Sequence, residues 1–86
     1  MYTAHVLLNN IAGAPAFVHL CDRMDCLVEL IQGPVFIDGR SIIGILSLDL
    51  SRPIRVEAHC RTPEEVAFFS DRIRPFLVEP PDEAGL

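Results

Sequence analysis

The sequence predicts an α+β fold in which a four-stranded antiparallel sheet carries three helices on one face. Two kinds of pattern lead to this prediction. Apolar and polar residues alternate in several short segments, which is typical of strands with one buried and one solvent-facing side. Two other segments place apolar residues three and four positions apart, as in helices with one buried face. The 86 residues suffice for one such domain but not for two.

The N-terminal half is expected to contain a strand, a helix and a hairpin. Positions 2, 4, 6 and 8 share one face of the first strand, which Asn9 ends. Pro15 fits the first turn of a helix, where its missing N–H leaves no hydrogen bond unmade, and an apolar stripe extends this helix to about Met24. Residues 27–31 and 35–37 are predicted to pair as a hairpin, because a Gly-Pro turn separates them.

The segment after the hairpin is predicted to be a short helix with too many apolar residues for one buried face. It reads Arg40-Ser41-Ile42-Ile43-Gly44-Ile45-Leu46-Ser47-Leu48. Ser41 stands where the helix would begin, so its hydroxyl can accept a hydrogen bond from a backbone N–H of the first turn. Because the aliphatic side chains occupy both faces, some of them are expected to stay exposed. We interpret this helix as a docking surface for another protein.

A last strand and a longer helix are predicted in the C-terminal part. Residues 54–59 alternate between apolar and polar, and the next helix should begin at a capping box. The residues of this box are Thr62-Pro63-Glu64-Glu65. Pro75 is expected to end or bend the helix. We therefore expect one domain over residues 1–78 and a loosely ordered, acidic and proline-containing tail over residues 79–86.

Composition argues against several classes of partner and site. The net charge of −5 and the absence of lysine disfavour direct binding to nucleic acid. No apolar segment approaches the roughly 18 residues of a membrane span, and no secretory signal is visible, so we expect a cytoplasmic protein. Cys21, Cys26 and Cys60 match no zinc motif and are expected to be reduced, mostly buried thiols. Neither a metal site nor a cofactor is predicted.

Two motifs and the order of elements resemble HPr, the histidine-containing phosphocarrier of the bacterial sugar phosphotransferase system. The segment 40–48 resembles Lys/Arg-Ser-Ile-Met-Gly-Val-Met-Ser-Leu of that family without a gap. The segment 10–16, which reads Asn-Ile-Ala-Gly-Ala-Pro-Ala, resembles Gly-Ile-His-Ala-Arg-Pro-Ala. The resemblance implies the HPr-like open-faced β-sandwich with element order βαββαβα.

The same resemblance implies that this chain is not an enzyme of phosphoryl relay. The phosphorylated histidine of the family falls on Ala12, and the arginine that assists it falls on Ala14. Relay needs a nucleophilic imidazole at the start of the helix, where free N–H groups stabilise the phosphate. His5, His19 and His59 are not expected to replace it, since two lie on predicted strands and His19 lies within the helix. The alternative is a phosphocarrier with a non-standard phosphoacceptor.

The catabolite-repression paralogue of HPr also lacks the histidine but keeps a regulatory serine. Resemblance to it implies phosphorylation at Ser41 by a serine kinase and docking onto a transcription regulator or metabolic enzyme. The implied docking residues are Ile42, Ile43 and Leu46, with Phe17 and Cys21 extending the surface, while Ile45 and Leu48 match core positions. Ser41 can equally be only a helix cap, and the spacing of Phe17 and Cys21 also fits a buried stripe. A third interpretation is a binding module that assembles with a larger enzyme.

Overall fold

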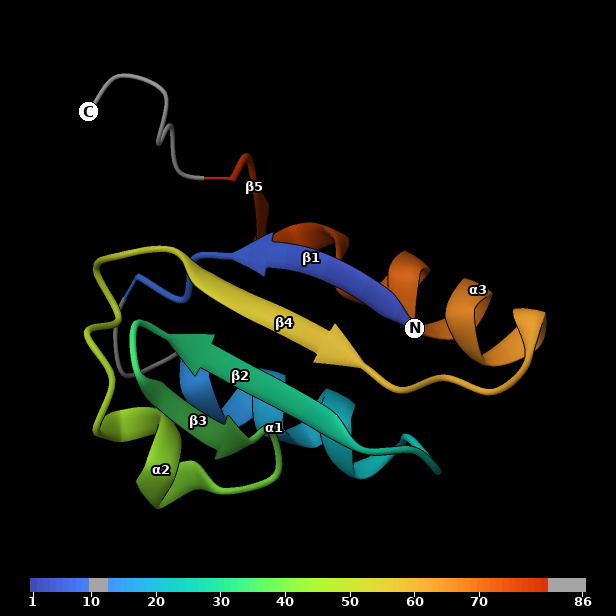
Figure 1. Cartoon of the computed structure of the whole chain (residues 1–86), viewed down its shortest axis with the longest axis horizontal. Coiled ribbons are helices and arrows are strands. Elements are labelled where there is room, and N and C mark those ends of the chain that lie inside the picture. The colour runs from blue at the N-terminus through green and yellow to red at the C-terminus, as the bar shows by residue number, and fades with distance from the viewer. Residues whose placement is uncertain (10–12, 81–86) are drawn as a thin grey trace.

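The computed structural model describes residues 1–9 and 13–80 and confirms the α+β architecture, in which helices cover one face of an antiparallel sheet (Figure 1). The sheet has the strand order β3-β2-β4-β1-β5, so the central strands β2 and β4 are far apart in the sequence. In chain order the elements are β1 (Tyr2–Val6), α1 (Gly13–Asp22), β2 (Val28–Gln32), β3 (Val35–Asp38), α2 (Ile42–Leu46), β4 (Ile54–Ala58), α3 (Pro63–Arg72), the 3₁₀ turn η1 (Arg74–Phe76) and β5 (Leu77–Val78).

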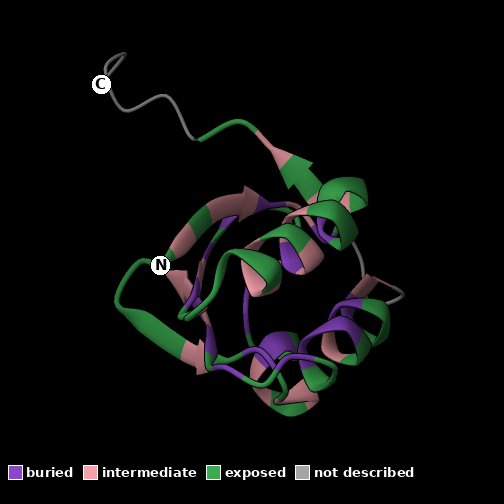
Figure 2. Cartoon of the chain, turned by 90° about the vertical axis from the view of Figure 1, so that its right-hand side faces the viewer, coloured by how far each residue is buried: buried purple, intermediate pink, exposed green. Residues whose placement is uncertain are grey.

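The two faces of the sheet differ as the alternating pattern predicts. In β4, Ile54, Val56 and Ala58 are fully buried against the helices, whereas Arg55 is exposed and Glu57 is half-buried. Because opposite residues of paired strands share a face, the register places Glu29 of β2 beside Glu57 on the solvent side. Figure 2 shows the buried positions between the sheet and the helices. The other face of the sheet is therefore open.

The sheet contains one short strand more than the four predicted. After α3 the chain passes through η1, since Pro75 has no N–H for a further helical hydrogen bond. Leu77 and Val78 then pair with Val6 and His5 at the free edge of β1. This pairing satisfies backbone groups of β1 that would otherwise lie unpaired at the edge.

The core is formed by apolar residues of the three helices and of the sheet. The predicted apolar stripe is confirmed as buried: Phe17, Leu20, Cys21 and Met24. The helix itself ends at Asp22, so Met24 reaches the core from the turn that follows α1. Two edge-to-face ring pairs join distant segments. Phe17 lies 5.4 Å from Phe76, and Tyr2 lies 5.7 Å from Phe69, between ring centroids. The core therefore ties α1 to the segment that follows α3, and β1 to α3.

The capping box at the start of α3 is confirmed. The Oγ1 of Thr62 accepts a hydrogen bond from the N–H of Glu65 at 3.1 Å. The Glu65 carboxylate in turn accepts from the N–H of Thr62 at 3.2 Å and from that of Arg61 at 2.7 Å. Pro63 occupies the first turn, as predicted.

The C-terminal tail is described only in part. Glu79 and Pro80 are exposed, and residues 81–86 of the predicted tail lie outside the described residues. Across residues 1–9 and 13–80, the helices are too short or too polar for any of them to span a lipid bilayer.

Candidate functional site

The candidate site is built on α2, a helix of five residues that is fixed at both ends. Ser41 has extended backbone angles, with φ of −95° and ψ of 99°, and its Oγ accepts a hydrogen bond from the N–H of Gly44 at 3.1 Å. The predicted cap is therefore confirmed. At the other end, the Ser47 hydroxyl donates to the carbonyl of Gly44.

The inner face of α2 is anchored in the core. Ile45 is fully buried and Leu48, just beyond the helix, is nearly so, as the resemblance implied. Gly44 permits a close approach to β3, because a Cβ at this position would lie 2.5 Å from the Cγ2 of Ile37. The short helix is thus held by packing, since so few residues would not form a stable helix alone.

Three aliphatic side chains of α2 were predicted to dock a partner, and we call them the α2 surface: Ile42, Ile43 and Leu46. Ile43 is 77% exposed and Leu46 is 42% exposed, whereas Ile42 is partly buried and packs against the core. The sequence predicted exposure on this helix, and the structure assigns it chiefly to Ile43.

The prediction that Phe17 and Cys21 extend the docking surface is wrong. Phe17 is 0% exposed and Cys21 is 1% exposed. The reason is the ring contact between Phe17 and Phe76, together with the packing of α1 onto the sheet. Burial also raises the pKa of the Cys21 thiol to about 12, with smaller contributions from Asp38 and Asp22. Both residues belong to the core.

A polar cluster on the open face of the sheet was not predicted from the sequence. The ligand-type atoms of Glu29, Glu57 and His59 all lie within 4.8 Å of one another. His59 Nε2 lies 2.8 Å from a Glu29 carboxylate oxygen, and Arg55 Nη2 lies 2.8 Å from a Glu57 carboxylate oxygen. Each carboxylate therefore has a cationic or hydrogen-bonding partner, which accounts for the cluster as a pair of surface contacts. Sequence spacing could not reveal it, because the β2–β4 register brings the residues together.

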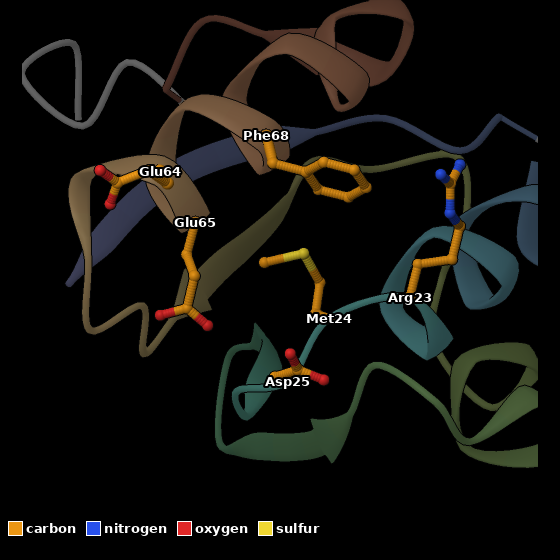
Figure 3. A pocket seen from close by; sticks show the side chains of 6 residues that line it. All are labelled: Arg23, Met24, Asp25, Glu64, Glu65 and Phe68. Atoms are coloured by element: carbon orange, nitrogen blue, oxygen red, sulfur yellow. The ribbon is translucent and has the colours of Figure 1, made fainter.

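A shallow hollow of about 240 Å³ lies between the end of α1 and the first turns of α3 (Figure 3). Its lining residues are Arg23, Met24, Asp25, Glu64, Glu65 and Phe68. The guanidinium carbons of Arg72 and Arg23 lie 3.7 Å and 5.1 Å from the centroid of the Phe68 ring. Glu65 is already engaged in the capping box. Several lining side chains thus have structural partners within the protein.

The first turn of α1, where the structure describes it, carries small side chains that pack tightly against their surroundings. A Cβ on Gly13 would lie 2.5 Å from the carbonyl oxygen of Leu8, and Ala14 is fully buried. Ala12 lies outside the described residues. Ala14 contributes only a buried methyl group at this end of the helix.

Comparison with known proteins gives a structural likeness without a sequence match. No protein-family model matches the sequence, and the search of curated proteins finds no match. The crystal structure of HPr-C-His from Thermoanaerobacter tengcongensis is similar, with a TM-score of 0.67 and 20% sequence identity, covering 86% of this chain and 92% of that one. The fold is HPr-like. At this identity the likeness establishes the fold, and the α+β prediction is confirmed.

In this HPr-like fold, the three histidines lie on three different segments of the chain. His5 lies on β1 opposite Arg55 and Val78, and His59 follows β4. His19 is an exposed residue six positions after Gly13, which corresponds to about 9 Å along the helix axis. The positions of His5 and His19 thus match the prediction, whereas His59 lies just beyond the end of β4 and not on the strand where it was predicted.

Proposed function

We propose that this chain is a non-catalytic HPr-like docking protein that binds another protein through the α2 surface. The observation that carries the proposal is the 77% exposure of Ile43 on a helix whose opposite face is anchored by fully buried Ile45. The anchor fixes the position of the helix, so the exposed side chain is presented in one orientation. A rigid aliphatic surface of this kind suits an apolar groove on a partner.

Absence of phosphoryl relay is the second part of the proposal. Ala12 and Ala14 stand where the resemblance to HPr places the phosphorylated histidine and its assisting arginine. Neither methyl side chain can act as a nucleophile or pair with a phosphate. Incubation with the phosphotransferase enzyme I and phosphoenolpyruvate is expected to yield no acid-labile phosphoprotein. An acid-labile phosphate on any residue would instead support the carrier alternative.

Phosphorylation of Ser41 by a serine kinase is the regulatory part of the proposal. The side chain is partly exposed at the start of α2, and the first turn of this helix contains no acidic residue. A phosphate would add about −1.5 to −2 charges there, where backbone N–H groups favour an anion. Incubation with a serine kinase and ATP should raise the intact mass by about 80 Da, with the phosphate mapping to Ser41. An unchanged mass would contradict regulation by phosphorylation at Ser41 but would not bear on docking through α2.

A matched pair of variants tests docking itself. The wild-type chain, immobilised as bait, is expected to retain a transcription regulator or metabolic enzyme from a native extract. Ile43→Asp should reduce its recovery at least about tenfold, because a charge would be desolvated at the interface. Leu27→Asp is the control, since Leu27 is also exposed, at 44%, but precedes β2 rather than lying on α2. Equal loss in both variants, or in neither, would contradict docking through α2.

A further inference from the structure

Two cysteines face each other next to the point where β2 begins and its antiparallel neighbour β4 ends. The register pairs Val28 with Ala58, and the N–H of His59 donates to the carbonyl of Leu27 at 2.8 Å, so pairing continues beyond the strands. Cys26 and Cys60 occupy the next opposite positions. Their Sγ atoms lie 3.8 Å apart, although the residues are 34 positions apart in the sequence.

We propose that Cys26 and Cys60 form a reversible disulfide bond, making this end of the sheet a redox-sensitive modification site. An S–S bond is about 2.05 Å long, so the sulfur atoms need to approach by less than about 2 Å. Directly opposed positions on antiparallel strands lie about 4.5–5.5 Å apart at Cα, which falls within the range of natural disulfides. Side-chain rotation can therefore close the bond while the strands remain paired.

The exposures of the two thiols set the order of the reaction. Cys60 is partly exposed, whereas Cys26 is 8% exposed, so an oxidant reaches Cys60 first. The Cys60 thiolate attacks a low-molecular-weight disulfide, forms a mixed disulfide and releases one thiol. The Cys26 thiol then loses its proton and attacks the Cys60 sulfur, which releases the second thiol. The protein loses two protons and two electrons, and the small disulfide is reduced to two thiols.

The surroundings of Cys60 make the first step slow at neutral pH. Burial raises its pKa to about 11, aided by the hydrogen bond with Cys26 and by the negative charge of Glu65, while the N-terminal ammonium opposes them. The thiolate is therefore scarce near pH 7, and the rate should rise about tenfold per pH unit below this pKa. Cys21, buried in α1 with a pKa of about 12, is expected to remain a thiol.

The bond would close a loop that contains β2, β3, α2 and β4. Constraining this loop in the unfolded chain stabilises the folded protein, so the melting temperature should rise by roughly 10 °C or more on oxidation. The reduced value should return after treatment with a thiol reductant.

Oxidation of the full chain with oxidised glutathione tests the proposal. The product should be a monomer about 2 Da lighter than the reduced protein, with a Cys26–Cys60 peptide link and no glutathione attached. Cys26→Ser should instead accumulate an adduct on Cys60, about 305 Da heavier, because the second step is blocked. Cys21→Ser is the control and should behave as the wild type.

Three results would overturn the proposal. They are a stable glutathione adduct on the wild-type chain, a disulfide that joins two molecules or includes Cys21, and a fully reduced protein after prolonged exposure at pH 9. A melting temperature that falls when the Cys26–Cys60 link forms would contradict the claim that the strands remain paired.

Discussion

Helices α2 and α3 begin in the same way and differ in what surrounds the beginning. In each, a hydroxyl oxygen, that of Ser41 in α2 and that of Thr62 in α3, accepts a 3.1 Å hydrogen bond from the backbone N–H three residues later. In α3 the residue at that position is Glu65, whose carboxylate bonds back to the chain. In α2 it is Gly44, which has no side chain. Only α3 therefore already holds a negative charge at its first turn.

This difference indicates separate uses for similar caps. The cap of α3 is complete: the Thr62 hydroxyl and the Glu65 carboxylate both accept hydrogen bonds from backbone N–H groups at its start, and Pro63 occupies its first turn. The cap of α2 leaves the positive end of the helix without an anionic side chain in the first turn. Such an end can accept a phosphate, which supports the proposed modification of Ser41. We therefore expect the buried face of α2 to contribute to stability and its exposed face to the proposed docking.

The largest expected loss of stability comes from truncating two fully buried core residues, Phe69 of α3 and Ile45 of α2. Phe69→Ala in α3 should lower the free energy of unfolding by about 3–5 kcal/mol, and Ile45→Ala in α2 by about 2–5 kcal/mol, since both residues are fully buried. Ile43→Ala is the matched control and should change it by less than about 0.5 kcal/mol. Urea denaturation measures all three. A loss for Ile43→Ala as large as that for Ile45→Ala would contradict the division of α2 into an anchored and an exposed face.

A smaller loss of stability is expected when the capping residues of α2 and α3 are replaced. Thr62→Ala should lower the free energy of unfolding by about 1–2 kcal/mol, because it also removes the partner that positions Glu65. Ser41→Ala should lower it by about 1 kcal/mol, and Ser41→Asp by only a few tenths, because aspartate also caps helices. Thermal unfolding of the three variants gives the order. A strongly destabilised Ser41→Asp would show that the start of α2 does not accept negative charge.

The smallest expected change in stability comes from replacing Asp38, which lies three residues before Ser41. Its carboxylate accepts a 2.9 Å hydrogen bond from the backbone N–H of Arg40 and pairs with the guanidinium at 3.5 Å, which lowers its pKa below 3.8. A lowered carboxyl pKa stabilises the folded state above the unfolded value, and this contribution disappears as the pH falls through the folded value. Asp38→Asn should therefore be less stable than the wild type at pH 7, and this difference should be smaller at about pH 3, below the unfolded value. An equal difference at both pH values would contradict this pairing.

Local patterns allowed much of the fold to be predicted. The stripe of α1, the capping box of α3 and the serine cap of α2 depend on residues within a few positions of one another, so their spacing is visible in the sequence. The exposure of α2 was predictable as a surplus of aliphatic residues. Its assignment to Ile43 rather than Ile42 required the helix to be placed against the sheet.

Long-range pairing decided the features that the sequence did not reveal. The edge strand β5 forms because the chain after Pro75 reaches β1, and the Glu29–His59 contact and the Cys26–Cys60 thiol pair both follow from the β2–β4 register. The burial of Phe17 and Cys21, which excludes them from the proposed docking surface, depends on how α1 packs against the remainder of the core.

The sequence by itself determined the order and type of the main helices and strands and the caps of α2 and α3. Tertiary structure alone decided which aliphatic side chains face solvent and which distant polar and sulfur atoms meet. The physical reason is that periodicity and capping act over one or two turns of chain, whereas burial and strand register depend on how all the elements pack together.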